Sequence, residues 1–534
     1  MASHRGFGRG LIWSLIAVLI AVSFKWFEGG DAGKGGSEPT LVWVRGADSA
    51  RLDPADIDDT ESVKVVNCLF EGLTQFVPGS TDVEPCLAEA WEISDDGLEY
   101  RFKLRTGVRF HDGSLLTPEV AVESFRRQMD RSHRFHFPEG NYPYWDAMYS
   151  VVESVRPDGP EHLIFRLTER HAPFLASLAV FPAAILSVEA LESRGFGFGQ
   201  RPVGTGPYRF VEWIPKDRIV LRRWDGYWGA SPKLERVVFK VVPSADTRLL
   251  QVQTGDGHGM DGLDTAQISV VWDDPSLKLY RGPGMNIGYL AMNTQIAPMS
   301  DVRFRRGVAM AIDKANIIRS AYQGAAVAAK TPLPPFMLGY HSDLPEVEFD
   351  PEAARELVSQ VPGFDRPITL NTMSNPRPYM PNPSRVAELI KEDLQRIGLN
   401  IRIQVNEWGA HRTALMSGSH DMGMFGWVGD NGDPDNFLWV LFGPDSVRKG
   451  AALNVSFFVD DRLTEVLGLG RQVGARAERA GYYREAQEIL QAQMPVVPLV
   501  HAEDMGVVRS EVEGFVLQPT GDLDFLPVWL RDAP

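Results

Sequence analysis

The sequence predicts an α/β protein built from more than one compact unit. Its 534 residues are too many for one ordinary domain, because domains average about 150 residues. Hydrophobic residues make up 44% of the chain and charged residues 23%, a composition that can bury a core along most of its length. A helix pattern at 386–397 runs directly into a strand pattern at 401–405. That order is typical of a helix–strand unit in an α/β fold.

The individual elements follow from local patterns. In Leu98–Leu104 apolar and charged residues alternate, which predicts a half-buried strand. Thr117 and Pro118 then provide a capping hydroxyl and a first-turn proline, so a helix is expected to begin there. The other predicted elements are strands at 219–223 and 237–242, helices capped by Asp301 and Asp313, the second ending at Gly324, the helix 386–397 ending at Gly398, the strand 401–405, the helix 482–494 and the buried strand 496–500.

The N-terminus predicts export. Basic side chains precede the charge-free apolar run Leu11–Phe24, which is the layout of a secretory signal. The run is shorter than the roughly 20 residues of a full membrane span. We therefore expect residues 1–28 to be a signal peptide or an uncleaved membrane anchor, followed by a Gly-rich tether at 29–39. A buried helix of the fold is the alternative.

Charge and missing motifs exclude several function classes. Acidic residues outnumber basic ones by 70 to 54, giving a net charge of −16, so nucleic acid is not an expected partner. The phosphate loop, the nucleophile elbow and the zinc-binding helix motif are absent. The eleven histidines show no metal-ligand spacing, and His111 is expected to serve a turn. The sequence thus predicts no cofactor, no metal and no enzymatic activity.

Cys68 and Cys86 are the two cysteines of the chain. In an exported protein a lone pair this close in sequence predicts a disulfide, which would stabilise the fold by about 3 kcal/mol. Two separate buried thiols are the alternative.

The segment 425–437 is the richest polar stretch of the chain. A calcium loop is excluded because Gly432 stands where a ligand is needed, and a plain surface turn is the simpler alternative. Trp427, however, precedes Asp430 by three residues. An aromatic wall beside a carboxylate suits an ammonium group.

A second segment, 375–382, suits a carboxylate. Prolines on both sides of Arg377 stiffen the loop that also carries Tyr379. A rigid guanidinium fork matches a carboxylate bidentately, although an ordinary surface arginine is the alternative. Together with Asp430, Arg377 predicts a site for a molecule that carries both an ammonium and a carboxylate, as peptides and amino acids do.

Several ordered blocks carry a family resemblance. They are Leu87–Gly97 with its continuation LEYRFKLRTGVRFHDGSLLTPE, Gly204–Tyr208, Trp224–Gly229, Asp301–Arg306, AIDKANII at 311–318, Tyr322–Gly324 and Gly426–Phe437. Through these blocks the chain resembles the family-5 extracellular solute-binding proteins of ABC importers, and most closely their dipeptide-binding branch, from about Pro39 to the C-terminus.

The resemblance implies a two-lobed periplasmic-binding-protein-like fold with a hinge and an enclosed ligand cleft. Lobe 1 would comprise residues 40–285 and 500–534, and lobe 2 residues 286–499. Arg377 would take the peptide carboxylate, Asp430 would take the α-ammonium, and Trp427 would line the pocket, with Gly429 and Tyr379 completing the expected ligand-binding set.

The resemblance also implies partners and alternatives. The protein would capture short peptides, dipeptides first, outside the cytoplasm as a monomer. It would deliver them to an ABC transporter permease, with ATPase subunits involved indirectly and the membrane contacted only through the N-terminal segment. Alternatives are another zwitterion, an opine, a metal complex such as haem, or a sugar. A membrane-tethered ligand sensor and a hydrolase using Asp430 and Asp433 as an acid–base pair are further alternatives.

Overall fold

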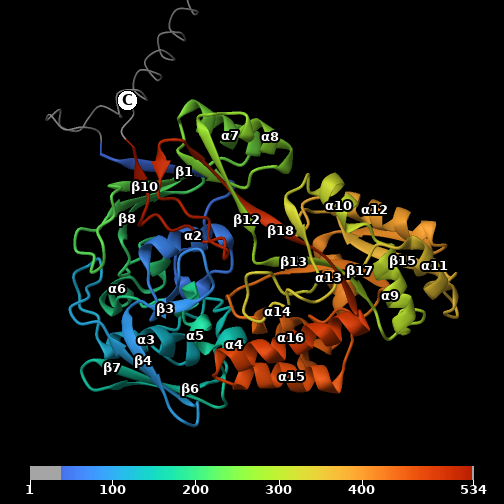
Figure 1. The fold of residues 1–534 in the computed structure, drawn as a ribbon. Helices are drawn as coiled ribbons and strands as arrows, with labels where there is room; N and C mark the ends of the chain where they lie inside the picture. Colours follow the sequence, from blue (N-terminus) through green and yellow to red (C-terminus); the bar gives the residue numbers. More distant parts are fainter. Residues whose placement is uncertain (1–37, 532–534) are drawn as a thin grey trace, which may run out of the picture. The chain divides into compact units, whose positions relative to one another are not determined.

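A computed structural model describes residues 38–531 of the chain. Within these residues the largest element is a mixed sheet of 12 strands (Figure 1). Ten strands follow the order β16-β15-β17-β13-β18-β11-β1-β10-β9-β8, and β12 and β14 also pair with β18. The strands are β1 (Thr40–Arg45), β8 (Tyr208–Ile214), β9 (Arg218–Arg223), β10 (Arg236–Val241), β11 (Gly259–Asp261), β12 (Leu277–Pro283), β13 (Asn286–Met292), β14 (Ala326–Ala328), β15 (Pro367–Met373), β16 (Asn400–Asn406), β17 (Met422–Val428) and β18 (Val496–Arg509).

Strand β18 connects two parts of this sheet. Up to Ala502 it pairs with β13 and β14, and from Glu503 onward it pairs with β12 and β11. The Asn286 amide bonds both backbone groups of Ala502, donating to its carbonyl at 2.9 Å and accepting from its N–H at 2.8 Å. The pairing partner of β18 therefore changes from β13 to the preceding strand β12 next to Ala502. We call this place the crossing of β12, β13 and β18, and Asn286 fixes the backbone there.

Smaller sheets and short helices make up the rest of the N-terminal half, and one further two-stranded sheet, β19-β20, comes from the C-terminal end of the chain. The small sheets are β4-β5-β7-β6, β2-β3 and β19-β20. Their strands are β2 (Thr74–Phe76), β3 (Val83–Pro85), β4 (Ala88–Ile93), β5 (Glu99–Leu104), β6 (Val152–Asp158), β7 (His162–Leu167), β19 (Val512–Glu513) and β20 (Trp529–Leu530). The helices are α2 (Thr60–Leu69), α3 (Pro118–Met129), α4 (Trp145–Met148), α5 (Phe174–Ser177), α6 (Val188–Arg194), α7 (Ala245–Thr254) and α8 (Ile268–Trp272), with 3-10 turns η1 (Pro54–Asp56), η2 (Phe181–Ala183), η3 (Gly195–Gln200) and η4 (Thr265–Gln267).

The later half of the chain carries the longer helices. Helix α12 connects the parallel strands β15 and β16, which makes a strand–helix–strand unit. The helices are α9 (Val302–Ala311), α10 (Lys314–Ala321), α11 (Pro351–Ser359), α12 (Pro383–Arg396), α13 (Trp408–Met416), α14 (Asp435–Phe442), α15 (Asp461–Gln472) and α16 (Arg476–Gln493), with the 3-10 turn η5 (Pro444–Val447).

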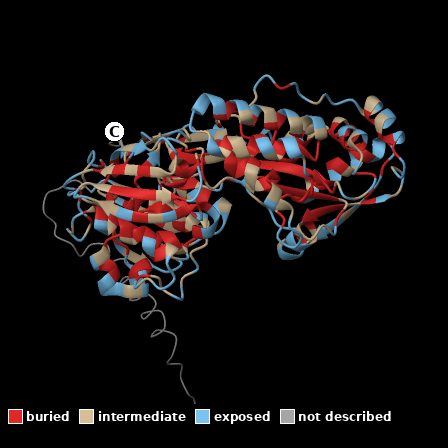
Figure 2. Ribbon diagram, turned by 90° about the horizontal axis from the view of Figure 1, so that it is seen from below, coloured by how far each residue is buried: buried red, intermediate tan, exposed pale blue. Residues whose placement is uncertain are grey.

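Buried apolar side chains form four clusters in the described part of the chain. Figure 2 shows the burial of each residue along the ribbon. The buried members of two clusters come from residues 41–277 and 507–528. Those of the other two come from residues 285–502. The core thus divides at the crossing of β12, β13 and β18.

Most elements predicted from sequence are confirmed. Residues Tyr100, Phe102 and Leu104 alternate as buried positions on β5, and Thr117 caps α3 by accepting from the backbone of Val120. Asp301 and Asp313 cap α9 and α10 in the same way.

The last predicted helix is longer than its apolar pattern indicates. The apolar spacing predicts it over 482–494, whereas α16 begins at Arg476. Its first turns bury Arg479, whose guanidinium pairs with Asp433 at 2.8 Å. Apolar periodicity cannot show this, because the buried side chain is charged.

The predicted signal or anchor at 1–28 lies outside the described residues, as does the tether at 29–39 except for its last two residues. In the part of the chain that the structure describes, no helix has the length and apolar character needed to cross a bilayer.

Candidate ligand-binding site

Two neighbouring parallel strands bring the predicted segments to the same edge of the sheet. Strands β15 and β17 are paired in parallel. Arg377 and Tyr379 lie in the loop after β15, while Trp427 is near the end of β17 and Asp430 follows it. Carboxyl ends of parallel strands meet at one edge, which is where ligands bind in open α/β sheets.

Tyr379 fixes the Arg377 loop to this edge. Its ring lies so close to Gly426 of β17 that a Cβ there would be 2.3 Å from the ring. Its carbonyl accepts from the Tyr322 hydroxyl at 2.9 Å, and Arg377 and Met380 exchange two backbone hydrogen bonds. The Tyr379 ring and backbone hydrogen bonds therefore hold the loop in place. The Arg377 side chain is not needed for this and can contact a ligand.

The Arg377 guanidinium stacks on an aromatic ring. Its central carbon lies 3.6 Å from the centre of the Trp408 ring, and Phe425 stacks with Trp408 at 5.7 Å and 16°. The Nε atom is buried without a hydrogen-bond partner, and no carboxylate among residues 38–531 pairs with this arginine. Trp408 was missed by sequence reasoning, because no pattern places the start of α13 beside residue 377.

Asn436 organises the Asp430 loop. Its amide oxygen accepts from the Trp427 indole at 3.0 Å and from the Asp430 backbone N–H at 2.9 Å. Its amide nitrogen donates to the Asp430 carboxylate at 3.4 Å. The Gly429 N–H donates to the carbonyl of Met285 at 2.8 Å, which ties the loop to the start of β13. Asn436 lies within the predicted segment, but sequence reasoning gave it no role.

Asp430 is partly buried, and its carboxylate has no basic partner among the described residues. Burial raises its pKa above the ordinary value, while hydrogen bonds from Asn436 and from the Tyr144 hydroxyl act in the opposite direction. A carboxylate held by neutral donors in a desolvated place is suited to accept an ammonium group.

The other two acids of the segment form buried ion pairs. Asp433 pairs with Arg479 at 2.8 Å, and Asp435 pairs with Arg471 at 3.0 Å. Burial raises the pKa of Asp435 to about 7. Because Asp433 is already neutralised by an arginine, the pair Asp430 and Asp433 does not have the free partner that an acid–base mechanism needs.

The loop also contacts the N-terminal half of the chain. Asn431 donates to the Ser177 hydroxyl at 3.3 Å, and Ala172 donates its N–H to the carbonyl of Arg471 at 2.6 Å. A Cβ on Gly432 would be 2.3 Å from Thr81. Thr81 and Ser177 of the N-terminal half thus lie against the Asp430 loop, and Ala172 is bonded to Arg471, the partner of Asp435.

His111 has the expected turn role. Its ring bonds the carbonyl of Gly206 at 2.9 Å and the N–H of Gly204 at 3.3 Å, and burial lowers its pKa to about 4. It also lines a cavity of about 1080 Å³, which none of the five predicted ligand-binding residues lines. No group of three or more potential metal ligands occurs in residues 38–531.

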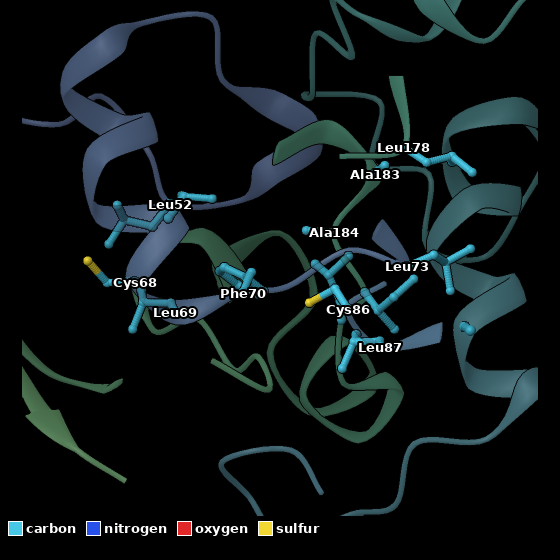
Figure 3. Packing of buried hydrophobic residues seen from close by; sticks show 14 of the residues in the cluster. Leu52, Cys68, Leu69, Phe70, Leu73, Cys86, Leu87, Leu178, Ala183 and Ala184 are labelled. Atoms are coloured by element: carbon cyan, nitrogen blue, oxygen red, sulfur yellow. The ribbon is translucent and has the colours of Figure 1, made fainter. Parts of the chain in front are cut away.

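The predicted disulfide is not present in this structure. Cys68 and Cys86 are both buried free thiols, and in Figure 3 their sulfur atoms lie in separate parts of the core, Cys68 beside Leu69 and Cys86 beside Leu87. Cys68 donates its thiol to the carbonyl of Lys64 within α2. The alternative of two separate buried thiols describes the structure, because each sulfur packs into the core instead of facing the other.

Comparison with known proteins gives consistent matches over most of the chain. The model of the bacterial extracellular solute-binding proteins, family 5 (middle region), matches residues 82–449. Heme-binding protein A of Haemophilus influenzae is 36% identical, with 91% of this chain and 92% of that protein covered. The dipeptide-binding protein of Escherichia coli is 35% identical, with 86% and 88% covered.

A solved structure agrees with the sequence matches. The periplasmic binding protein DppA of Helicobacter pylori, in complex with the peptide STSA, superimposes with a TM-score of 0.75 at 32% identity, covering 92% of this chain and 98% of that one. The fold is thus that of the periplasmic binding proteins, as predicted. The chain belongs to the family-5 bacterial extracellular solute-binding proteins, with dipeptide-binding proteins among its relatives.

Proposed function

We propose that this protein captures short peptides, dipeptides first, by holding the two charged ends. Arg377 takes the ligand carboxylate and Asp430 takes the α-ammonium. Trp427, Gly429 and Tyr379 line the site. Dipeptide-binding relatives support this choice of ligand.

One observation carries the proposal. At a single sheet edge, an arginine without a carboxylate partner and a partly buried carboxylate without a basic partner are both present among the described residues. Each charge is oriented by neutral or aromatic neighbours, Trp408 for Arg377 and Asn436 for Asp430. An unpaired buried charge is costly, and a zwitterionic ligand would pair both charges at once.

The same proposal includes how the chain is organised. Lobe 1 is residues 40–285 with 500–534, and lobe 2 is 286–499. The division of the core clusters and the crossing of β12, β13 and β18 support a hinge at this place. Lobe closure would enclose the peptide and shift an open–closed equilibrium.

Family membership supports the proposed delivery and location. The protein acts as an exported monomer without catalysing a reaction, and it hands its ligand to an ABC transporter permease whose ATPase subunits work separately. The N-terminal segment tethers it to the membrane or is removed as a signal. A tethered sensor remains the alternative role for the same binding site.

Haem is a second candidate ligand. It is supported by the 36% identity to heme-binding protein A, which is as high as the 35% identity to the dipeptide-binding relative. Haem also carries carboxylates that Arg377 could bind, but it has no ammonium group for Asp430.

Titration calorimetry with end-blocked peptides tests the proposal. Alanyl-alanine should bind, and blocking either its ammonium by acetylation or its carboxylate by amidation should weaken binding by about 2–5 kcal/mol. Arg377→Gln should remove the penalty for amidation only, and Asp430→Asn the penalty for acetylation only. Arg412→Gln is the matched control, because this exposed arginine lies farther from the same Trp408 ring, at 5.9 Å.

The outcomes separate the candidates. Equal affinity for free and blocked peptides would reject the assignment of the two ends. Binding of haem, followed by its absorbance, with no binding of alanyl-alanine would favour the second candidate. Binding of neither ligand would reject both.

A further inference from the structure

A cavity of about 260 Å³ in the N-terminal half carries an unusual set of charges. Three carboxylates line it, those of Glu71, Asp522 and Asp524. No lysine, arginine or histidine of the described chain lines it. The remaining walls are largely apolar, including Phe76, Val180 and other aliphatic and aromatic side chains.

Glu71 has a structural role. It accepts hydrogen bonds from the Thr205 hydroxyl at 2.7 Å, the Tyr227 hydroxyl at 2.8 Å and the Trp228 indole at 2.9 Å. Arg105 also faces this carboxylate and favours its charge. Both of its oxygens are thus occupied by the protein.

Asp522 and Asp524 differ from Glu71 because no basic side chain of residues 38–531 lies near enough to favour their charge. Asp522 accepts only from Asn67 at 2.7 Å and from Thr520 at 2.8 Å. Asp524 accepts from the backbone of Leu526 at 2.9 Å. Burial raises the pKa of Asp522 to about 6 and raises that of Asp524 as well. Two carboxylates therefore border a cavity without a counter-charge.

A polar group with an unused donor also faces the cavity. The Gln518 side chain is only 8% exposed, and its oxygen accepts from the N–H of Gly79 at 2.7 Å. Within the described residues its amide nitrogen makes no hydrogen bond and is not enclosed by the protein, so this donor is open to a partner from outside the chain.

The cavity connects with Asp430 by two routes. Phe181, which lines it, packs edge-to-face on Tyr144 at 5.2 Å, and the Tyr144 hydroxyl bonds Asp430. In addition, the backbone of Met285 bonds both Gly429 and Pro519, and Pro519 lies between the lining residues Gln518 and Thr520. A ligand held at Asp430 would have this cavity beside it.

From these observations, we propose that the cavity is a subsite for a basic side chain of the bound ligand, with Asp522 and Asp524 as its counter-charges. Lysine and arginine have an apolar stem and a cationic end, which match apolar walls and unpaired carboxylates. The volume exceeds the 10–15 Å³ that one water needs by more than tenfold, so an extended side chain has room. This inference rests on the proposed peptide-binding function and specifies its substrate class as peptides containing lysine or arginine.

Calorimetry with pairs of peptides that differ only in charge tests it. Lysyl-alanine is compared with norleucyl-alanine, and alanyl-lysine with alanyl-norleucine, because norleucine keeps the stem and lacks the ammonium. In one of the two residue orders the lysine peptide should bind about tenfold more tightly than its norleucine counterpart. Asp522→Asn with Asp524→Asn should reduce that ratio to about twofold or less, while the exposed Asp273→Asn, the same chemical change elsewhere, should leave it unchanged.

Each outcome bears on the inference. If the lysine and norleucine peptides bind the wild-type protein equally in both residue orders, the inference is overturned. This comparison does not depend on the folding of any variant. A preference that persists in the folded double variant would also overturn it. If alanyl-alanine binds with dependence on Arg377 and Asp430 but lysine gives no gain, the subsite alone fails. If no peptide binds, the proposed function fails and the subsite with it.

Discussion

The Arg377 guanidinium lies face-on to the Trp408 ring, with its central carbon 3.6 Å from the ring centre. Stacking of this kind uses the face of the guanidinium and leaves its edge of N–H donors free. Trp408 thus orients the arginine without consuming the hydrogen bonds that a carboxylate needs.

Replacing this ring should weaken the recognition of one ligand end. We expect Trp408→Leu to lower affinity for alanyl-alanine by about 1–2 kcal/mol, because the cation–π contact and the orientation are lost together. Trp408→Phe keeps an aromatic face and should retain most of the affinity. The readout is calorimetric affinity for the free peptide against its C-terminal amide. An unchanged ratio between these two ligands in Trp408→Leu would contradict the positioning role.

As the pH is lowered, peptide affinity should begin to fall at a higher pH than it would if Asp430 had an ordinary carboxylate pKa. Burial raises the pKa of Asp430, and only the ionised form attracts an ammonium. Affinity is therefore full above this raised pKa and decreases as pH falls through it, by up to about tenfold per pH unit. Titrations from pH 8 to pH 4 measure the profile. Asp430→Asn should bind weakly with a flatter profile, and an identical profile in both proteins would contradict the assignment.

Gly426 is required by the Tyr379 ring. A Cβ at this position would lie 2.3 Å from the ring and 2.5 Å from the carbonyl of Ile287. Gly426→Ala should therefore lower the free energy of unfolding by about 1–3 kcal/mol and weaken binding by displacing the Arg377 loop. Gly468→Ala is the control: it lies within α15 with no atom near its Cβ position, so helix propensity should make it neutral or stabilising. Equal urea midpoints for the two variants would reject this packing argument.

The buried pair of Asp433 and Arg479 should contribute strongly to stability. Arg479→Met leaves the Asp433 charge buried without a partner, which costs about 3–5 kcal/mol. Arg462→Met removes the same type of side chain from the exposed pair with Glu485 and should cost at most about 1 kcal/mol. Urea unfolding followed by circular dichroism compares them. A smaller loss for Arg479→Met than for Arg462→Met would contradict the structure.

Both cysteines should titrate as thiols. In guanidinium chloride without reductant we expect two reactive thiols per chain, because the structure holds both sulfurs free. In the native protein the reaction should be slow, since burial raises the pKa of both thiols and shields them. Ellman's reagent provides the measurement. A count of zero in denaturant would restore the disulfide predicted from sequence.

The features of this protein differ in how far the sequence alone predicts them. Local patterns predicted β5, α3, α9, α10 and α12 because alternation, helical spacing and capping residues act over a few neighbouring positions. They also identified the segments of Arg377 and Asp430, because a proline-stiffened arginine and an acid near a tryptophan have evident chemistry.

The α/β class, the family and the two charged segments can be predicted without a structure, since these depend on local spacing and on residue types along the chain. The tertiary structure alone decided that Trp408 stacks on Arg377, that Asn436 holds Asp430, that Arg479 neutralises Asp433 and that the two thiols stay apart. These relationships join residues that are separated along the chain or whose partners are fixed by loop geometry. Their energies come from packing and desolvation, which exist only after the strands and helices have come together.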